Sequence, residues 1–298
     1  MRHRIAQLTR WSDDVRRQLT DMAYRLYDRV VERLEQSERW SFVALPQSKP
    51  EVKTPAGPRT TRVPDGTRVY AIGDVHGRAD LLVRMFDLIE ADITASAGGD
   101  DVIIVFLGDY IDRGFQSKDV IDFLLGERVA AFNCIFLKGN HEEAFLKFLN
   151  EPAFGPRWAG YGGGETLTSY GVRPPRTRTK PEEWVEASQQ LSAALPDDHR
   201  VFLMTLQIQA SIGDYVFVHA GLRPGKPMEK QTEQDLLWIR DDFINSSESF
   251  DQLVVHGHTP VSEPYRDHRR IAVDTGAYMT GHLTAACFVR DEVTFLTT

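Results

Sequence analysis

The sequence predicts an α/β fold in which two packed mixed β-sheets are flanked by helices, preceded by one N-terminal helix. Three observations predict it. Apolar strands alternate with helical stretches three times between residues 67 and 149, the part from 215 to 296 is richer in strands, and polar clusters containing glycine follow five of these strands. Alternation of this kind implies right-handed crossovers and largely parallel, buried strands. With 298 residues, 42% of them hydrophobic, the chain is long enough to bury a sizeable core.

Residues 1–44 predict one amphipathic helix. Its apolar side chains recur every three or four residues and form a single stripe: Ile5, Leu8, Trp11, Val15, Leu19, Met22, Leu26, Val30 and Leu34. We expect this helix to pack on the rest of the chain or on its twin in a homodimer. An interfacial membrane helix is the weaker alternative, because the polar face is mixed rather than basic.

Residues 45–66 predict a linker, because five prolines interrupt them: Pro46, Pro50, Pro55, Pro58 and Pro64. Such a segment cannot hold a helix and is unsuited to the interior of a sheet. The compact domain is therefore expected to span residues 67–298.

The first half of that domain predicts three strand–helix pairs. The strands are expected at 68–72, 102–107 and 134–137, and the helices that follow them at 80–93, 117–129 and 142–149. The second half adds strands at 215–218, 253–255, 271–273, 283–289 and 292–296.

Composition and charge exclude several classes of protein. The formal net charge of −8 argues against a nucleic-acid partner, because the phosphate backbone is bound mainly by cationic surface. No run of about 18 apolar residues predicts a membrane span, and the polar N-terminus is unlike a secretory signal, so we expect a cytoplasmic protein. Cys134 and Cys287 each lie in an apolar run, which predicts buried free thiols.

Five polar clusters fall where predicted strands end. They are Gly73-Asp74-Val75-His76-Gly77, Gly108-Asp109-Tyr110-Ile111-Asp112-Arg113-Gly114, Gly139-Asn140-His141-Glu142, His219-Ala220-Gly221 and His256-Gly257-His258-Thr259. Ligands of open α/β sheets gather beyond the carboxyl ends of the strands. Oxygen and imidazole donors without thiolate suit divalent Mn, Fe or Zn. A lone histidine at a strand end is usually structural, but five such clusters together predict a metal-dependent site.

These clusters, in this order and spacing, resemble those of the metal-dependent phosphoprotein phosphatases within the calcineurin-like metallophosphoesterases. The segments 108–114 and 139–142 carry the most specific likeness. The segments 158–171 and 236–240 resemble the small bacterial Ser/Thr phosphatases of that group. The resemblance covers roughly residues 67–298 and implies a metallophosphoesterase catalytic domain, a β-sandwich with α-β-β-α layers.

The resemblance implies a role for each site residue. Two divalent metal ions, with Mn expected in vitro and Fe or Zn as alternatives, would be held by Asp74, His76, Asp109, Asn140, His219 and His258, with Asp109 bridging both. His141 would be the general acid, and Asp112 would orient it. Arg113 and Arg240 would bind the substrate phosphate together with Asn140 and His141. Hydroxide held between the metals would then attack phosphorus directly.

Several neighbouring residues are expected to play supporting parts. His256 precedes the Gly-His pair and is interpreted as the end of a buried strand or as an orienting group. Asp274 and Tyr278 are expected beside the site, in orienting or structural roles. Glu142 is expected to cap the helix that follows it. The glycines at 162–164 are expected to shape a loop on the substrate side.

The favoured function is therefore a phosphomonoesterase that removes phosphate from phosphoserine and phosphothreonine in proteins or peptides, with phosphotyrosine as a further candidate. An alternative is a hydrolase of diadenosine polyphosphates, which shares the motif set. A non-catalytic binding scaffold of the same fold is the minor alternative, since such a scaffold would be expected to have lost ligands or the acid.

Overall fold

The computed structural model describes residues 61–96, 98–176 and 180–298. The predicted helix over 1–44 and most of the predicted linker lie outside the described residues. Within the linker, Thr61–Gly66 belong to the same unit as the rest of the described chain. Val63 is fully buried there, and its N–H donates to the carbonyl oxygen of Arg290 over 2.8 Å. The end of the linker therefore packs on the domain.

The first sheet has the strand order β10-β9-β1-β2-β3. Its strands are β1 (Thr67–Ile72), β2 (Asp101–Phe106), β3 (Asn133–Phe136), β9 (Thr284–Val289) and β10 (Glu292–Thr297). β1, β2 and β3 run parallel, while β9 pairs antiparallel with both β1 and β10.

The second sheet has the order β4-β5-β6-β8-β7. Its strands are β4 (Gln209–Ile212), β5 (Tyr215–Val218), β6 (Leu253–His256), β7 (Tyr265–Arg266) and β8 (Arg270–Ala272). β5, β6 and β8 run parallel, with β4 and β7 antiparallel at the two edges.

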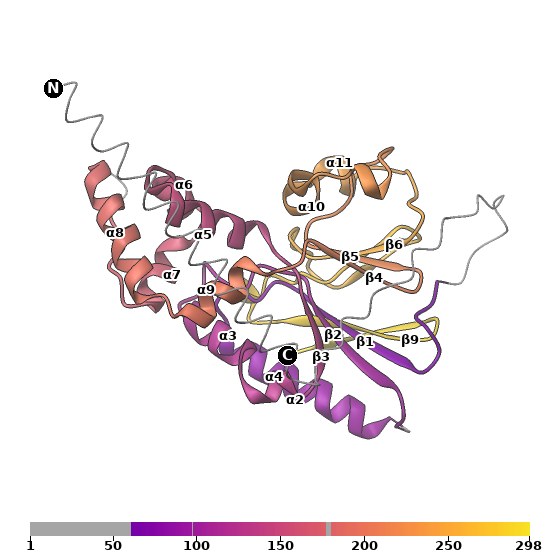
Figure 1. Ribbon diagram of the computed structural model, residues 1–298. Coiled ribbons are helices and arrows are strands. Elements are labelled where there is room, and N and C mark those ends of the chain that lie inside the picture. Colours follow the sequence, from indigo (N-terminus) through magenta and orange to yellow (C-terminus); the bar gives the residue numbers. More distant parts are fainter. Residues whose placement is uncertain (1–60, 97, 177–179) are drawn as a thin grey trace. The chain divides into compact units, whose positions relative to one another are not determined.

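Alternation of side chains along the strands builds three apolar layers. On β1, Val69 and Ala71 face the other sheet, whereas Tyr70 and Ile72 face helices. On β5, Tyr215 and Phe217 join the layer between the sheets, and Val216 and Val218 pack under the helices of the second sheet. Because successive side chains of a strand point to opposite faces, strands that are apolar throughout suit two buried faces, and the four-layer α-β-β-α arrangement follows (Figure 1).

The helices cover the outer faces of the two sheets and one end of the domain (Figure 1). In chain order they are α2 (Ala79–Ala95), α3 (Ser117–Leu124), α4 (Glu127–Ala130), α5 (Asn140–Asn150), η1 (Pro152–Phe154), α6 (Gly155–Ala159), α7 (Gly163–Ser169), α8 (Pro181–Ala194), α9 (Asp197–Met204), η2 (Met228–Lys230), α10 (Glu233–Trp238), α11 (Asp241–Ile244) and α12 (Ala277–Thr280).

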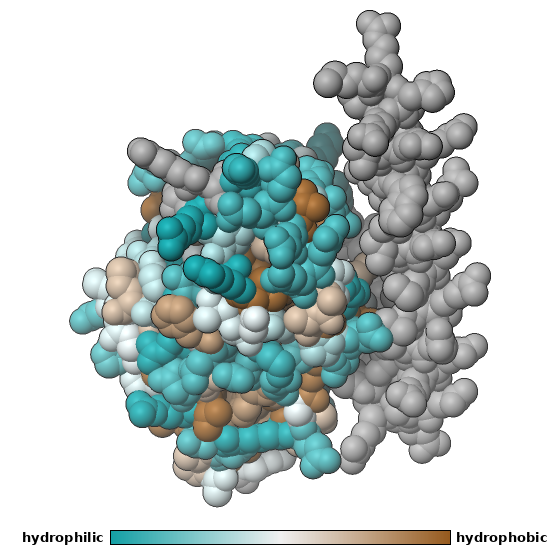
Figure 2. Space-filling model, turned by 90° about the vertical axis from the view of Figure 1, so that its left-hand side faces the viewer, coloured by the Kyte–Doolittle hydropathy of each residue, from teal (hydrophilic) through white to brown (hydrophobic). Residues whose placement is uncertain are grey.

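The predicted fold class is confirmed, and the strands expected from apolar runs agree with the observed ones to within one or two residues. One helix differs: the stretch predicted as 117–129 divides into α3 and α4, because the chain turns at Leu125 and Gly126. Cys134 and Cys287 are buried free thiols, as expected. No helix among the described residues combines the length and apolar character that a membrane span requires. On the face shown in Figure 2, apolar residues occur singly or in small groups among hydrophilic ones.

Candidate functional site

The carboxyl ends of six parallel strands meet at one edge of the sandwich, and the predicted site residues follow five of them. The sixth strand, β8, supplies Asp274. The site residues that follow the strands are almost completely buried, with none more than 4% exposed: Asp74, His76, Asp109, Asp112, Asn140, His141, His219 and His258. The fold therefore brings together side chains that lie as far apart as residues 74 and 258.

The carboxylate of Asp109 lies between two groups of histidines. Its Oδ2 is 3.6 Å from Nε2 of His76 and 3.8 Å from Nε2 of His141, and its Oδ1 is 3.4 Å from Nε2 of His219. Each group offers convergent ligand atoms that could hold a metal ion: His76, Asp109 and His141 in one, and Asp109, His219 and His258 in the other. One carboxylate shared by two such groups is the geometry of a dinuclear centre.

The second group fits a cation well. Nε2 of His219 lies 2.9 Å from Oδ1 of Asn140 and 3.1 Å from Nδ1 of His258. The other ring nitrogen of His258 is buried and has no hydrogen-bond partner among the described residues. A buried ring nitrogen without a partner is costly unless a ligand or water satisfies it, and on the other edge of the same ring three polar atoms converge. Imidazole, carboxylate and amide donors together suit Mn, Fe or Zn.

Backbone carbonyls fix two of the imidazoles in orientation. Nδ1 of His76 lies 2.9 Å from the oxygen of Ile111, and Nδ1 of His219 lies 2.8 Å from the oxygen of Leu107. A ring that donates through Nδ1 leaves the lone pair of Nε2 free toward the centre. Burial lowers the pKa of His76 well below its usual range and lowers the pKa of His258 to about 2. Both rings are thus held neutral, the form that binds a metal.

Burial alone would raise the pKa of Asp109, but His219 and His141 hold it well below its usual range. Asp109 is therefore an anion in the middle of the site, as a bridging ligand must be.

Asp74 lies beside the centre without joining either convergent group among the described residues. Both of its carboxylate oxygens accept the backbone N–H of His258 over 3.1 Å. A Cβ on Gly257 would come within 2.1 Å of its Oδ1, so glycine is required where the loop after β6 crosses this carboxylate. Burial, together with the charges of Asp274 and Asp109, raises the pKa of Asp74 well above its usual range. Its ligand role stays a prediction.

His141 is oriented by a buried carboxylate. Its Nδ1 lies 2.7 Å from Oδ2 of Asp112. Burial would lower the pKa of His141, but the charges of Asp109 and Asp112 raise it above its usual value. The same ring belongs to the first convergent group, so its geometry suits either a metal ligand or a proton donor.

Two residues that the sequence analysis did not single out hold Asp112 in place. Trp158 donates its indole N–H to Oδ2 over 2.9 Å, and Thr166 donates its hydroxyl to Oδ1 over 2.6 Å. Trp158 lies on α6 and Thr166 on α7, both within residues 158–171. That segment was the signal in the sequence, but its spacing alone does not show which side chains point at Asp112.

Arg113 lies at the mouth of the site. One guanidinium nitrogen is 3.3 Å from Nε2 of His141, and the guanidinium stands 4.7 Å from the ring centre of Tyr278. The N–H of Arg113 donates to the carbonyl of Gly162 over 3.0 Å, and a Cβ on Gly162 would come within 2.6 Å of that nitrogen. Gly162 thus permits the close approach that positions Arg113.

Arg240 contacts the loop that bears His258. It donates to the carbonyl oxygen of His258 over 3.0 Å, and its side chain is exposed. Arg113 and Arg240 therefore flank the two histidine groups, an arrangement that suits phosphoryl oxygens.

Glu142 does more than cap its own helix. Its carboxylate accepts the N–H of Gly139 over 2.8 Å, which caps α5 as expected, and it also accepts those of Asp109 and Tyr110 over 2.9 and 2.8 Å. Burial and the charge of Asp109 raise the pKa of Glu142 to about 7. One carboxylate thus ties the loop after β2 to the start of α5.

The neighbouring residues lie as follows. His256 lies outside both convergent groups; its Nε2 lies 3.1 Å from Arg270, and burial lowers its pKa to about 3. Asp274 accepts the N–H of Gly276 over 2.8 Å, and burial raises its pKa. The ring centre of Tyr278 is 5.3 Å from that of His76.

Backbone strain concentrates at this site. Of the six described residues other than glycine with positive φ, five belong to it: His76, Asp109, Asp112, Arg113 and His258. Such conformations cost about 1–3 kcal/mol each and persist only where the surroundings impose them.

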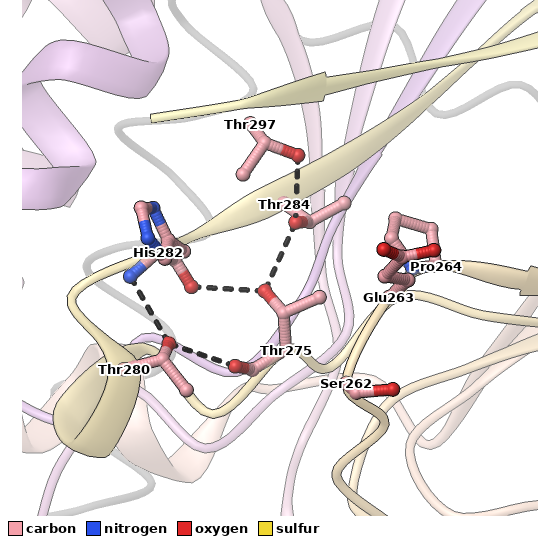
Figure 3. Close-up of a pocket in the computed structure, with 8 residues that line it drawn as sticks. All are labelled: Ser262, Glu263, Pro264, Thr275, Thr280, His282, Thr284 and Thr297. Carbon is pink, nitrogen blue, oxygen red and sulfur yellow. Dashed lines mark hydrogen bonds between the residues drawn. The ribbon is translucent and has the colours of Figure 1, made fainter.

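A cavity of about 260 Å³ elsewhere contains none of the predicted site residues (Figure 3). It is lined by Ser262, Glu263, Pro264, Thr275, Thr280, His282, Thr284 and Thr297. The hydroxyls of Thr275, Thr284 and Thr297 are hydrogen-bonded to one another, so this cavity offers little to a phosphate.

Comparison with known proteins agrees with this geometry. A family model described as calcineurin-like phosphoesterase matches residues 67–285. The asymmetrical bis(5'-nucleosyl)-tetraphosphatase PrpE of Anoxybacillus flavithermus is 26% identical over 235 residues, 72% of this chain and 87% of the relative. Its counterpart in Halalkalibacterium halodurans is 28% identical over 237 residues, 74% of this chain and 90% of the relative.

A crystal structure described as a candidate diadenosine tetraphosphatase superposes with a TM-score of 0.51 at 20% identity, covering 78% of this chain and 94% of that one. This likeness supports the fold.

Proposed function

This chain belongs to the calcineurin-like phosphoesterase family, and on that premise we propose that it hydrolyses dinucleoside polyphosphates, cleaving a dinucleoside tetraphosphate asymmetrically. Water and one phosphoanhydride bond would give a nucleoside monophosphate and a nucleoside triphosphate. The observation that carries the hydrolytic assignment is the carboxylate of Asp109 shared by two histidine groups.

The substrate class departs from the one favoured by the sequence analysis. Removal of phosphate from proteins was the favoured function there, and diadenosine polyphosphate hydrolysis was the alternative. Relatives named as asymmetrical tetraphosphatases match about three quarters of this chain and most of their own length. They support the alternative better than the protein phosphatase assignment.

The residues that would hold two divalent ions are Asp74, His76, Asp109, Asn140, His219 and His258. Bound there, such a pair lowers the pKa of a water molecule and stabilises charge on phosphoryl oxygens. Asn140 adds an oxygen donor without adding charge, so the centre stays electrophilic.

The protein's own groups bind the substrate and move the proton. Arg113 and Arg240 hold the phosphoryl oxygens from two sides. Nε2 of His141 is 3.3 Å from Arg113 and is the atom from which a proton reaches the departing oxygen. Asp112, bound to Nδ1 of His141, stabilises the protonated ring. General acid catalysis of this kind contributes about 10²–10⁴-fold.

A comparison of substrates tests the proposal. The purified, Mn-loaded protein is assayed side by side on diadenosine tetraphosphate and on a phosphoserine peptide, with Asp109→Asn as the background control. We expect kcat/KM to be at least about tenfold higher on the dinucleotide, a preference that corresponds to about 1.4 kcal/mol in the transition state. A higher value on the phosphopeptide would restore the protein phosphatase assignment. Manganese as the metal that supports activity in vitro, with Fe or Zn as alternatives, a cytoplasmic location and a homodimer through residues 1–44 stay predictions.

A further inference from the structure

A cavity of about 270 Å³ adjoins the site at Arg240, between helices α10 and α11. We call it the α10–α11 pocket. It is lined by Arg223, Gln234, Trp238, Ile239, Arg240, Asp241 and Asp242. Pockets that hold whole drug-sized ligands measure about 300–1,000 Å³. This pocket therefore suits one moiety of a dinucleotide rather than the whole molecule.

An aromatic wall connects the pocket to the catalytic histidine. The indole N–H of Trp238 donates to Glu143 over 2.6 Å, which fixes the orientation of the ring. The ring centre of Trp238 is 5.7 Å from that of Tyr161, and the ring of Tyr161 is 6.1 Å from the imidazole of His141. One ring, that of Tyr161, thus lies between the indole of Trp238 and the imidazole of His141.

The charges of the pocket balance. Arg223 is paired with Asp235 over 2.5 Å and with Asp242 over 2.8 Å, so its charge is already compensated. Asp241 is exposed and forms no ion pair among the described residues. A lining with two cations and two anions does not suit a polyphosphate chain. An aromatic side chain beside the carboxylate of Asp241 suits a base and the hydroxyls of a ribose.

We propose that the α10–α11 pocket binds the nucleoside attached to the attacked phosphoryl group, with the base against the indole of Trp238 and the ribose hydroxyls donating to Asp241. This inference rests on the proposed function. Arg240 links the two sites, because it lines the pocket and also contacts the backbone of His258. A nucleoside is only one ester bond away from its phosphoryl group. If Arg240 holds that phosphoryl group, the nucleoside lies within reach of this pocket.

Variants of Trp238 test the base contact. Trp238→Leu, Trp238→Phe and the control Tyr265→Leu, which removes a partly exposed ring on β7, are assayed on diadenosine tetraphosphate and on p-nitrophenyl phosphate. Loss of base stacking corresponds to about 5- to 150-fold in affinity. We expect Trp238→Leu to lower kcat/KM at least about tenfold more on the dinucleotide than on p-nitrophenyl phosphate, mainly through KM. Trp238→Phe should recover most of this loss, and Tyr265→Leu should leave the ratio of the two substrates as in the parent protein.

Inhibition by products gives a second readout that does not depend on dinucleotide turnover. AMP and inorganic phosphate are compared as inhibitors of p-nitrophenyl phosphate hydrolysis. Trp238→Leu should raise the inhibition constant of AMP at least about tenfold and that of phosphate less than twofold. Asp241→Asn should weaken inhibition by AMP more than inhibition by 2',3'-dideoxy-AMP, which lacks both ribose hydroxyls.

The outcomes separate the two proposals. If the parent protein cleaves the dinucleotide but Trp238→Leu weakens inhibition by AMP and inhibition by phosphate equally, the pocket is not a nucleoside site and the proposed function stands. If the parent protein does not cleave the dinucleotide, both proposals fall.

Discussion

At the scale of single residues, the hydrogen bonds that hold Asp112 are as informative as the proposed metal ligands. Its buried carboxylate accepts hydrogen bonds from His141, Trp158 and Thr166. A carboxylate that is removed from water in this way needs its donors, because each missing one leaves a buried acceptor unsatisfied. The position of His141 therefore depends on helices α6 and α7.

Replacing Thr166 by Val tests this dependence. The variant keeps the shape of the side chain and removes the hydroxyl that donates to Asp112 over 2.6 Å. We expect kcat to fall about 10- to 100-fold with KM changed less than threefold, because a misplaced catalytic group slows the chemical step rather than binding. Thr168→Val on the same helix is the matched control, since its exposed hydroxyl bonds only the carbonyl of Gly164. Equal kcat values in the two variants would contradict this positioning role.

His256 carries a prediction about pH. Its folded pKa, lowered by burial to about 3, lies below the unfolded value of about 6.5. The unfolded chain therefore binds the extra proton first, so the stability that this residue contributes is complete above pH 6.5 and is lost as the pH falls toward 3. Urea unfolding of the metal-free protein between pH 7 and 4 should show a weaker pH dependence in His256→Gln than in the exposed-site control His268→Gln. Equal slopes would contradict the buried neutral state of His256.

At the scale of elements, Glu142 joins α5 to the loop after β2. Its carboxylate accepts N–H groups from Gly139, Asp109 and Tyr110. Because all these donors are buried, Glu142→Gln, which replaces one of the two accepting oxygens by an NH₂ donor, should lower the free energy of unfolding by about 2 to 4 kcal/mol. Urea unfolding in the presence of EDTA measures this, with Glu151→Gln at the exposed end of α5 as the control. A loss of unfolding free energy no larger than that of the control would show that the hydrogen bonds of Glu142 contribute little to stability.

The turn after β6 carries the sharpest steric prediction. A Cβ at position 257 would lie 2.1 Å from Oδ1 of Asp74, so Gly257→Ala must displace either that carboxylate or the loop that bears His258. We expect metal affinity to fall about 10- to 100-fold, as measured by competition with a chelator. Gly164→Ala in α7 is the control, since its Cβ would meet only Pro174 at 3.6 Å. Unchanged affinity in Gly257→Ala would show that Asp74 does not serve the centre.

At the scale of the whole molecule, the sequence predicted the parts of the fold that have a strong periodic signal. Short apolar runs such as Tyr215–Val218 predict strands buried on both faces, and this run is one. The edge strands β4 and β7 were missed, because Gln209–Ile212 has only four residues and Tyr265–Arg266 only two, which is too short to signal a strand. Their structure comes from pairing with β5 and β8, which local sequence does not encode.

The candidate site also has a part that the sequence predicts and a part that depends on tertiary contacts. The residues at the strand ends could be located because parallel strands deliver them to one edge, and the structure brings Asp109, Asn140, His141, His219 and His258 together as predicted from the sequence. The contacts of Trp158 and Thr166 with Asp112, and those of Glu142 beyond its own helix, could not be assigned from the sequence, since they depend on tertiary packing between elements. The preference for a phosphoprotein or a dinucleotide as substrate depends on the side chains that surround the candidate metal site. The spacing of motifs along the chain does not show which side chains these are.

The proposed hydrolysis depends most on Asp109 as the carboxylate shared by two cations. The direct measurement is the number of divalent ions per chain, by elemental analysis after loading with Mn and removal of free metal, in the parent protein and in Asp109→Asn. We predict two ions in the parent protein, at most one in the variant, and a loss of at least about 10²-fold in kcat/KM. Two ions and full activity in a folded Asp109→Asn variant would contradict the role of Asp109 as the shared carboxylate.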